Sequence, residues 1–169
     1  MSMTFSELRP GTPVYLDTNV LVYDFAGRSG ECSRLVQQCK DEVVLGVLSS
    51  VTLQEFCHVA MCLEAGERQQ PPQEKLSASF LRKNPEIVRQ LWKYAAALEE
   101  ILAWANARII EIRKDQIFRS QDIRRRHGLL TNDSIIAQVM LDHGIEAIAT
   151  NDPDFERVEG VEVFKPSDL

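Results

Sequence analysis

Short apolar runs alternate along the chain with longer segments in which apolar residues recur at helical spacing. The short runs predict strands at residues 14–16, 43–48, 108–112, 147–150 and 161–164. The helical spacing predicts helices at residues 20–25, 32–39, 53–63, 85–107, 115–126 and 134–142, and the helix over 85–107 is the longest. Strands that alternate with helices favour an α/β fold, in which helices cover both faces of a central, mostly parallel sheet of about five strands.

The length and composition favour one domain. The chain has 169 residues, 44% of them hydrophobic, which is enough for one sizeable core. We expect a single domain over residues 1–169, with residues 66–84 as a surface excursion, because the sequence there includes QQPPQ and lacks an apolar period. The start of the chain lacks the pattern of a signal peptide, and no apolar run is long enough to span a bilayer, so we expect a cytoplasmic protein without a membrane partner.

The charge of the chain restricts how it could bind nucleic acid. The formal net charge is −6, which argues against a protein that coats nucleic acid non-specifically. Residues 108–127 are locally basic, and Arg124, Arg125 and Arg126 are candidates for phosphate contacts. A solvated helix with basic residues near its C-terminal end explains the same pattern through the helix dipole.

The cysteines and histidines do not predict a site. Cys32, Cys39, Cys57 and Cys62 lack the paired short spacings of a zinc site, so we expect reduced, mostly buried thiols. The three histidines are His58, His127 and His143. No histidine has a nucleophile nearby in the sequence, and we expect structural or surface roles for all three.

Four carboxylates stand where a predicted strand gives way to a helix or turn, or where a helix begins. They are Asp17, Glu55, Asp133 and Asp152. Ligands of open parallel sheets bind outside the carboxyl ends of the strands, so these side chains are expected to converge at one edge. Converging carboxylates repel one another, and a hard divalent cation with oxygen ligands relieves that repulsion. The pattern therefore predicts a shared metal site.

Helix capping offers a separate explanation for each acid. Asp17 could cap the helix that follows it, and Glu55 fits a capping box with Thr52. Asp133 lies in a segment rich in helix-starting residues, and Asp152 precedes a proline in the manner of an N-cap. Capping accounts for any one of the acids. It does not account for their recurrence at the same end of successive strands.

Four motifs resemble those of the PIN domain family, and in particular its VapC-like toxins. They are LDTNVL at residues 16–21, LQEF at 53–56, NDSIIA at 132–137 and TNDPDF at 150–155. Their order and their flanking residues carry the resemblance, which runs nearly from end to end of the chain.

The resemblance implies an α/β/α sandwich and a magnesium- or manganese-dependent endoribonuclease. It implies an RNA substrate, a protein antitoxin as a partner, and a homodimer. The acids carried over as metal ligands and catalytic residues are Asp17, Glu55, Asp133 and Asp152, with Asp154 as a further metal ligand. Thr18 and Thr150 match polar positions near the metal site and are assigned supporting roles. The expected reaction is in-line hydrolysis of a phosphodiester bond by a water that the metal activates.

Two other enzyme classes fit the residues less well, and one alternative stays open. A phosphatase of the haloacid dehalogenase type needs a second acid two residues after the first, where this chain has Asn19. A dinucleotide-binding fold needs a glycine-rich loop after the first strand, and none follows. The open alternative is a catalytically silent module that keeps the fold and binds RNA or a protein.

Overall fold

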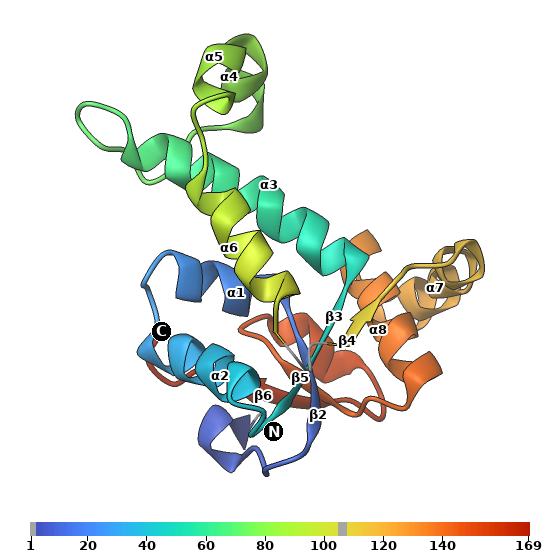
Figure 1. The fold of residues 1–169 in the computed structure, drawn as a ribbon. Coiled ribbons are helices and arrows are strands. Elements are labelled where there is room, and N and C mark those ends of the chain that lie inside the picture. The colour runs from blue at the N-terminus through green and yellow to red at the C-terminus, as the bar shows by residue number, and fades with distance from the viewer. Residues whose placement is uncertain (1–2, 105–107) are drawn as a thin grey trace.

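One sheet of parallel strands forms the centre of the molecule (Figure 1). The computed structural model describes residues 3–104 and 108–169, and within them the strand order is β1-β6-β5-β2-β3-β4, with every neighbouring pair parallel. The strands are β1 (Met3–Thr4), β2 (Pro13–Leu16), β3 (Leu45–Ser49), β4 (Arg108–Ile110), β5 (Ala147–Ala149) and β6 (Glu162–Lys165). The predicted α/β class is confirmed, and six strands stand where about five were expected.

Helices connect the strands. The α-helices are α1 (Thr18–Phe25), α2 (Gly30–Lys40), α3 (Ser50–Glu67), α4 (Ala78–Lys83), α5 (Pro85–Val88), α6 (Lys93–Leu102), α7 (Lys114–His127) and α8 (Thr131–His143). Two short 3-10 helices are η1 (Phe5–Glu7) and η2 (Pro153–Arg157). Helix α8 is capped at its C-terminal end by Gly144, which adopts the left-handed conformation with φ of 63° that suits glycine. None of the described helices is both long and apolar enough to cross a membrane.

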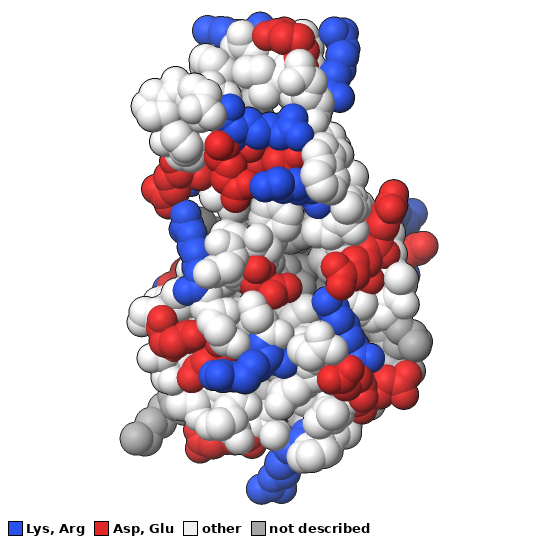
Figure 2. Space-filling view, turned by 60° about the vertical axis from the view of Figure 1, so that its left-hand side comes forward, with Lys and Arg blue, Asp and Glu red and all other residues white. Residues whose placement is uncertain are grey.

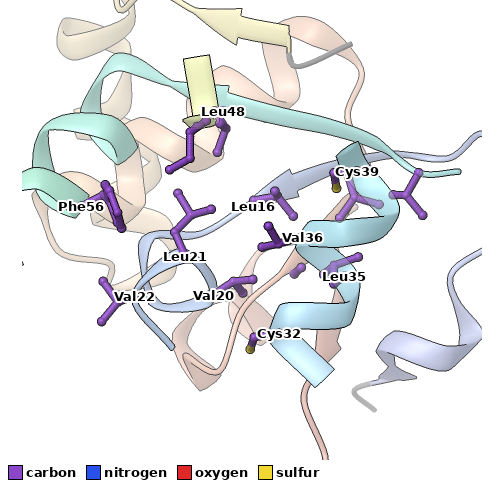
Figure 3. Close-up of a cluster of buried hydrophobic side chains, with 14 of the residues drawn as sticks. Leu16, Val20, Leu21, Val22, Cys32, Leu35, Val36, Cys39, Leu48 and Phe56 are labelled. Atoms are coloured by element: carbon purple, nitrogen blue, oxygen red, sulfur yellow. The ribbon is translucent and has the colours of Figure 1, made fainter. Parts of the chain in front are cut away.

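The two faces of the sheet bury separate hydrophobic clusters. Val14 and Leu16 point to the cluster beneath α1, α2 and α3, which Figure 3 draws, whereas Tyr15 between them belongs to the cluster beneath α8. Leu48 and Val47 of β3 divide in the same way. Because both faces of the sheet are covered, its strands are apolar almost throughout, and the three layers form the predicted α/β/α sandwich.

The prediction of one helix over residues 85–107 is wrong. The chain forms α5, breaks near Leu91 and restarts as α6, and residues 105–107 lie outside the described part. Glu64 of α3 is fully buried and accepts hydrogen bonds from the backbone N–H groups of Trp92 (2.9 Å) and Tyr94 (3.1 Å). A carboxylate at these free N–H groups stabilises a new helix start, so a tertiary contact overrides the helical pattern.

Other strand boundaries also differ from the prediction. The short edge strand β1 has no apolar run long enough to predict it, and β3 begins two residues later than expected, at Leu45. β4 ends at Ile110, before the predicted limit of 112. The longest of the described helices is α3, which has 18 residues. It begins over the sheet and continues well past it.

The far half of α3 carries a small projection made of α4 and α5, which stands away from the sheet in Figure 1. Its own hydrophobic cluster includes Cys62 of α3, Leu76, and Leu81 of α4. The segment before α4 passes so close to Gly66 that an added Cβ would lie 2.6 Å from the Cα of Lys75. Glycine at this position therefore permits the close approach that fixes the projection to α3.

Candidate active site

Five acidic side chains lie at the carboxyl edge of three adjacent strands, β5, β2 and β3. Asp17 directly follows β2, and Glu55 lies in the second turn of α3, which follows β3. Asp152 and Asp154 lie at the start of η2, shortly after β5, and Asp133 lies in the first turn of α8. Since the carboxyl ends of parallel strands share one edge, the topology brings together acids from four separate parts of the chain.

Asp17 is buried and firmly held. One carboxylate oxygen accepts a hydrogen bond from the backbone N–H of Thr18 (2.6 Å). The other accepts from the side-chain amide of Asn19 (2.5 Å) and from the hydroxyl of Thr150 (2.6 Å). These donors orient the carboxylate, and none of them is a cation. No hydrogen-bond partner of Asp17 among the described residues therefore neutralises its negative charge.

Thr150 and Asn19 connect the first acid motif to the last. The Thr150 hydroxyl accepts from the side chain of Asn19 (2.9 Å) and from the backbone N–H of Asp152 (2.9 Å). The side-chain oxygen of Asn19 accepts from the backbone N–H of Asn151 (3.0 Å). Because Thr150 is fully buried, this network fixes the distance between Asp17 and the η2 acids.

Glu55 is half-buried and receives two polar neighbours. The hydroxyl of Thr18 donates to its carboxylate over 3.3 Å, and the side-chain amide of Asn132 donates over 3.1 Å. Thr18 thus contacts both Asp17 and Glu55, through its backbone and its side chain respectively. Asn132 links Glu55 to the start of α8, where Asp133 is the next residue.

Asp133, Asp152 and Asp154 form the open part of the site. One carboxylate oxygen from each lies within 4.8 Å of the other two. Asp152 also accepts a hydrogen bond from the backbone N–H of Asp154 (2.8 Å), and Asp154 forms an ion pair with Arg157. An all-oxygen donor set at this spacing suits a hard divalent cation such as Mg²⁺ or Mn²⁺.

The site raises the pKa of two of its acids. Burial, together with the charges of Asp133 and Glu55, raises the pKa of Asp17 to about 6, although hydrogen bonds from Thr150 and Thr18 oppose the rise. Burial also raises the pKa of Asp133 to about 6, together with the charges of Asp152, Glu55 and Asp154. Arg157 opposes this rise only weakly. The carboxylates are therefore close enough to repel one another.

Two of the acids both cap a helix and lie in the shared site. Asp17 caps α1, and Asp152 caps η2 by accepting from the N–H of Asp154. The proposed capping box of Glu55 with Thr52 is wrong, because Ser49 is the N-cap of α3 and accepts from the N–H of Thr52. Glu55 therefore lies inside the helix, where capping cannot explain its position.

The basic residues near the end of α7 differ in their exposure. Arg124 is partly buried and donates to the hydroxyl of Ser120 (3.0 Å), and Arg125 lies 3.7 Å from Asp122. Arg126 is exposed and has no acidic partner among the described residues. Of the three, Arg126 offers the freest charge for a phosphate.

The predicted site residues did not include Asn19, Asn132 or Arg157. Both asparagines flank a site acid directly in the sequence, which is the signal that could have identified them. Arg157 lies three residues after Asp154, a spacing that places both on one side of a helical turn.

The predicted free cysteines are confirmed: all four are unpaired.

A comparison with known families decides where the chain belongs. A model described as PIN domain matches residues 14–161, which is most of the chain. The chain belongs to the PIN domain family. The family assignment agrees with the resemblance that the four motifs carry, and with the sandwich described above.

Two relatives of this PIN domain come from Methanocaldococcus jannaschii. Ribonuclease VapC2 is 21% identical over 153 residues, which cover 90% of this chain and 93% of the relative. Ribonuclease VapC6 is 28% identical over 159 residues, which cover 90% of this chain and 96% of the relative. The similarity thus extends over nearly the whole of each protein.

Solved structures share the fold of this PIN domain. VapBC2 from Rickettsia felis, solved with a DNA fragment from its promoter, matches with a TM-score of 0.56 and 17% identity over 92% of this chain and all of that chain. VapC20 from Mycobacterium tuberculosis, described as a Sarcin-Ricin loop cleaving toxin, matches with a TM-score of 0.57 and 15% identity over 89% of this chain and 98% of that one. At these identities the likeness concerns the fold.

Proposed function

We propose that the protein is a divalent-metal-dependent endoribonuclease that hydrolyses phosphodiester bonds of RNA. One observation carries the proposal: five carboxylates from distant segments converge with a single ion pair between them, to Arg157, among the described residues. Such an arrangement is unfavourable unless a cation neutralises it. The names of the two ribonuclease relatives support RNA as the substrate.

Each side chain has a role in the proposed site. Asp133, Asp152 and Asp154 would hold Mg²⁺ or Mn²⁺, with Asp17 and Glu55 as further ligands on the buried side. A divalent ion supplies a water of lowered pKa and neutralises charge on the phosphate. Thr150 and Asn19 keep Asp17 oriented, and Thr18 does so for Glu55.

The comparisons also support a biological setting for the proposed enzyme. Relatives named VapC and structures of VapBC pairs favour a toxin that a protein antitoxin restrains. We propose this pairing, a homodimer, and action on RNA in the cytoplasm. Co-expression with the product of an adjacent gene, followed by co-purification, tests the pairing, and the mass of the purified protein in solution tests the dimer.

Cleavage of RNA tests the proposed activity directly. The purified protein is incubated with structured and single-stranded RNAs in manganese, magnesium or EDTA, beside the Asp17→Asn and Asp133→Asn variants. Asp24→Asn is the matched control, because it removes one acid on α1 outside the cluster. We expect metal-dependent cleavage that both site variants reduce at least about 100-fold and the control leaves within about twofold.

The opposite outcome would favour the silent binding module. Under that alternative, the wild-type protein cleaves no RNA in any metal. Site variants and wild type then bind manganese equally poorly. Cleavage that persists in EDTA, or in both site variants, would instead point to a contaminating nuclease.

A further inference from the structure

A groove leads away from the acid site along α3. A hollow of about 290 Å³ at the site is lined by Val51, Gln54, Glu55, His58 and Asn132. A second hollow of about 450 Å³ lies between α3 and the α4–α5 projection, and its lining also includes His58. Because one exposed side chain borders both hollows, they adjoin along the same side of α3.

The second hollow combines an apolar floor with free positive charge. Met61, Leu81 and Val88 are among its apolar lining residues. Arg82 and Arg89 also line it, and both are exposed without an acid within ion-pair distance among the described residues. On the face drawn in Figure 2, basic side chains lie at the upper end of the molecule, where the projection lies, with an acidic side chain between them and a larger acidic group just below.

Several other arginines of the chain are neutralised locally. Arg28 pairs with Glu74 at 2.8 Å, and Arg119 pairs with Asp142 at 2.6 Å. Arg82 and Arg89 have no such partner, although they flank the same hollow. An unneutralised pair of guanidinium groups beside an apolar floor is suited to a ligand with both negative charge and a flat apolar surface.

We propose that the α3–α4–α5 hollow binds an unpaired nucleotide of the RNA strand whose backbone is cut at the acid site. Arg82 and Arg89 contact its phosphates or stack on its base, and His58 lies along the path between the two hollows. This inference rests on the proposed function, because it takes the acid site as the place of cleavage.

Three physical arguments favour RNA as the occupant. Unpaired bases are recognised by stacking on arginine planes as well as on aromatic rings, and this hollow offers two arginines. Pockets of about 300–1,000 Å³ suit small organic groups, and the volume of this hollow falls in that range. Continuity with the acid site adds the third reason. An acidic peptide or a second copy of the chain would need no such continuity.

Binding of single-stranded RNA of two lengths in EDTA tests the groove. The strands have about 4 and about 16 nucleotides, which bracket the usual site sizes of single-strand binders. In Arg82→Ala/Arg89→Ala, we expect about tenfold weaker binding of the long strand and a salt slope smaller by about 1.4, from ~0.7 per phosphate contact. Binding of the short strand should change less than about twofold.

A matched variant removes the same charge elsewhere. Arg9→Ala/Arg34→Ala takes away two exposed arginines, one before β2 and one on α2, and neither lines the two hollows. It should leave both affinities within about twofold. Equal losses in the two double variants, or no loss in either, would overturn the inference. So would a loss of self-association, or of acidic-peptide binding, without an effect on RNA.

Conservative substitution separates base stacking from charge. Arg82→Lys/Arg89→Lys keeps the charge and removes the guanidinium planes. We expect it to keep the salt slope of the wild type. We also expect it to lose about fivefold in its preference for the long strand over an abasic strand of the same length. An unchanged preference would overturn the base contact.

Cleavage in manganese separates this inference from the proposed function. Cleavage by the wild type, with long-strand binding unaffected in Arg82→Ala/Arg89→Ala, would reject the groove and leave the nuclease intact. Arginine-dependent binding without any cleavage would support the groove and reject the nuclease. Weaker binding and slower cleavage of the long strand alone is the result that both proposals predict together.

Discussion

Two clusters of acids in this chain have opposite electrostatic arrangements. On α7 and α8, Asp115 and Asp142 face guanidinium groups: Arg119 lies 2.9 Å from Asp115 and 2.6 Å from Asp142. Hydrogen bonds from Arg113 and Arg119 lower the pKa of Asp115 to about 2. At the acid site, burial and neighbouring carboxylates raise the pKa of Asp133 to about 6.

The two clusters differ in whether the protein supplies cationic side chains as partners for the acids. The α7–α8 cluster contains its own cations, so it needs nothing from solution and links two helices. The acid site has more carboxylates and only Arg157 as an ion-pair partner among the described residues. Identical functional groups therefore pair with cationic side chains in one place, and in the other they lack such partners, as the proposed cation site requires.

Introducing a cationic side chain at the acid site should abolish its electrostatic difference from the α7–α8 cluster. Asn132→Arg places a guanidinium next to Glu55, which Asn132 already contacts at 3.1 Å. We expect at least about 100-fold slower metal-dependent RNA cleavage, because the new charge competes with the divalent ion. Asn132→Ala is the control, and its loss of one supporting hydrogen bond should cost at most about tenfold. Equal cleavage rates in the two variants would mean that the added positive charge does not affect cleavage.

Manganese should stabilise the fold through the acid site alone. At about 100 times the dissociation constant, one bound ion adds about 2.7 kcal/mol to the free energy of unfolding. For a chain of this size, that corresponds to a Tm rise of about 5–10 °C. Thermal unfolding should show the full rise in wild type and in Asp115→Asn, and at most about half of it in Asp133→Asn. A rise in Asp133→Asn equal to that of the wild type would place the ion elsewhere.

Without metal, the two clusters should respond to pH in opposite directions. The folded chain holds a proton on Asp133 up to a pKa of about 6, whereas the usual value is 3.8. Between these values the folded state binds more protons than the unfolded state, so the free energy of unfolding falls as the pH rises. In EDTA, Asp133→Asn should be about 1–2 kcal/mol more stable than wild type at pH 7.5 and equal to it at pH 4.

Asp115 provides the opposite case. Its lowered pKa means that the carboxylate stabilises the fold above its usual value of 3.8, and that this stabilisation is lost as the pH falls toward 2. Asp115→Asn should therefore be less stable than wild type at pH 7.5. Denaturant unfolding at the two pH values measures both variants. The same sign for both at pH 7.5 would contradict the comparison.

The smallest expected effect concerns the basic end of α7. Arg126→Ala should weaken RNA binding about threefold and lower the salt slope by ~0.7, as expected for one phosphate contact. Arg125→Ala is the comparison, because Asp122 lies 3.7 Å from Arg125 and partly neutralises it. An unchanged salt slope in Arg126→Ala would mean that Arg126 contacts no phosphate and only belongs to a solvated helix face.

The sequence predicted the sandwich because both of its periodicities are strong. β2, β3 and β5 are buried on two faces, so they read as apolar runs, and α8 ends at a glycine. The break between α5 and α6 could not be predicted, because it depends on buried Glu64, 28 residues before Trp92 in the sequence. Edge strand β1 has two residues and too few apolar positions for any periodicity.

The convergence of the acids could be predicted from the sequence because parallel strands place their carboxyl ends together. The partners that orient them were harder to identify. Asn19 contacts Thr150 across 131 positions and Asn132 contacts Glu55 across 77, distances over which spacing contains no information. The groove beside Arg82 and Arg89 was also hidden, since residues 66–84 have no apolar period that would predict how α4 packs on α3.

Calorimetric titration with Mn²⁺ at pH 7.5 tests most directly whether the unpaired carboxylates form a cation site. Wild type and Asp115→Asn should bind at least one ion with the same affinity, and Asp133→Asn should bind it at least about tenfold more weakly. Equal binding by wild type and Asp133→Asn, or no binding by the wild type, would contradict the account.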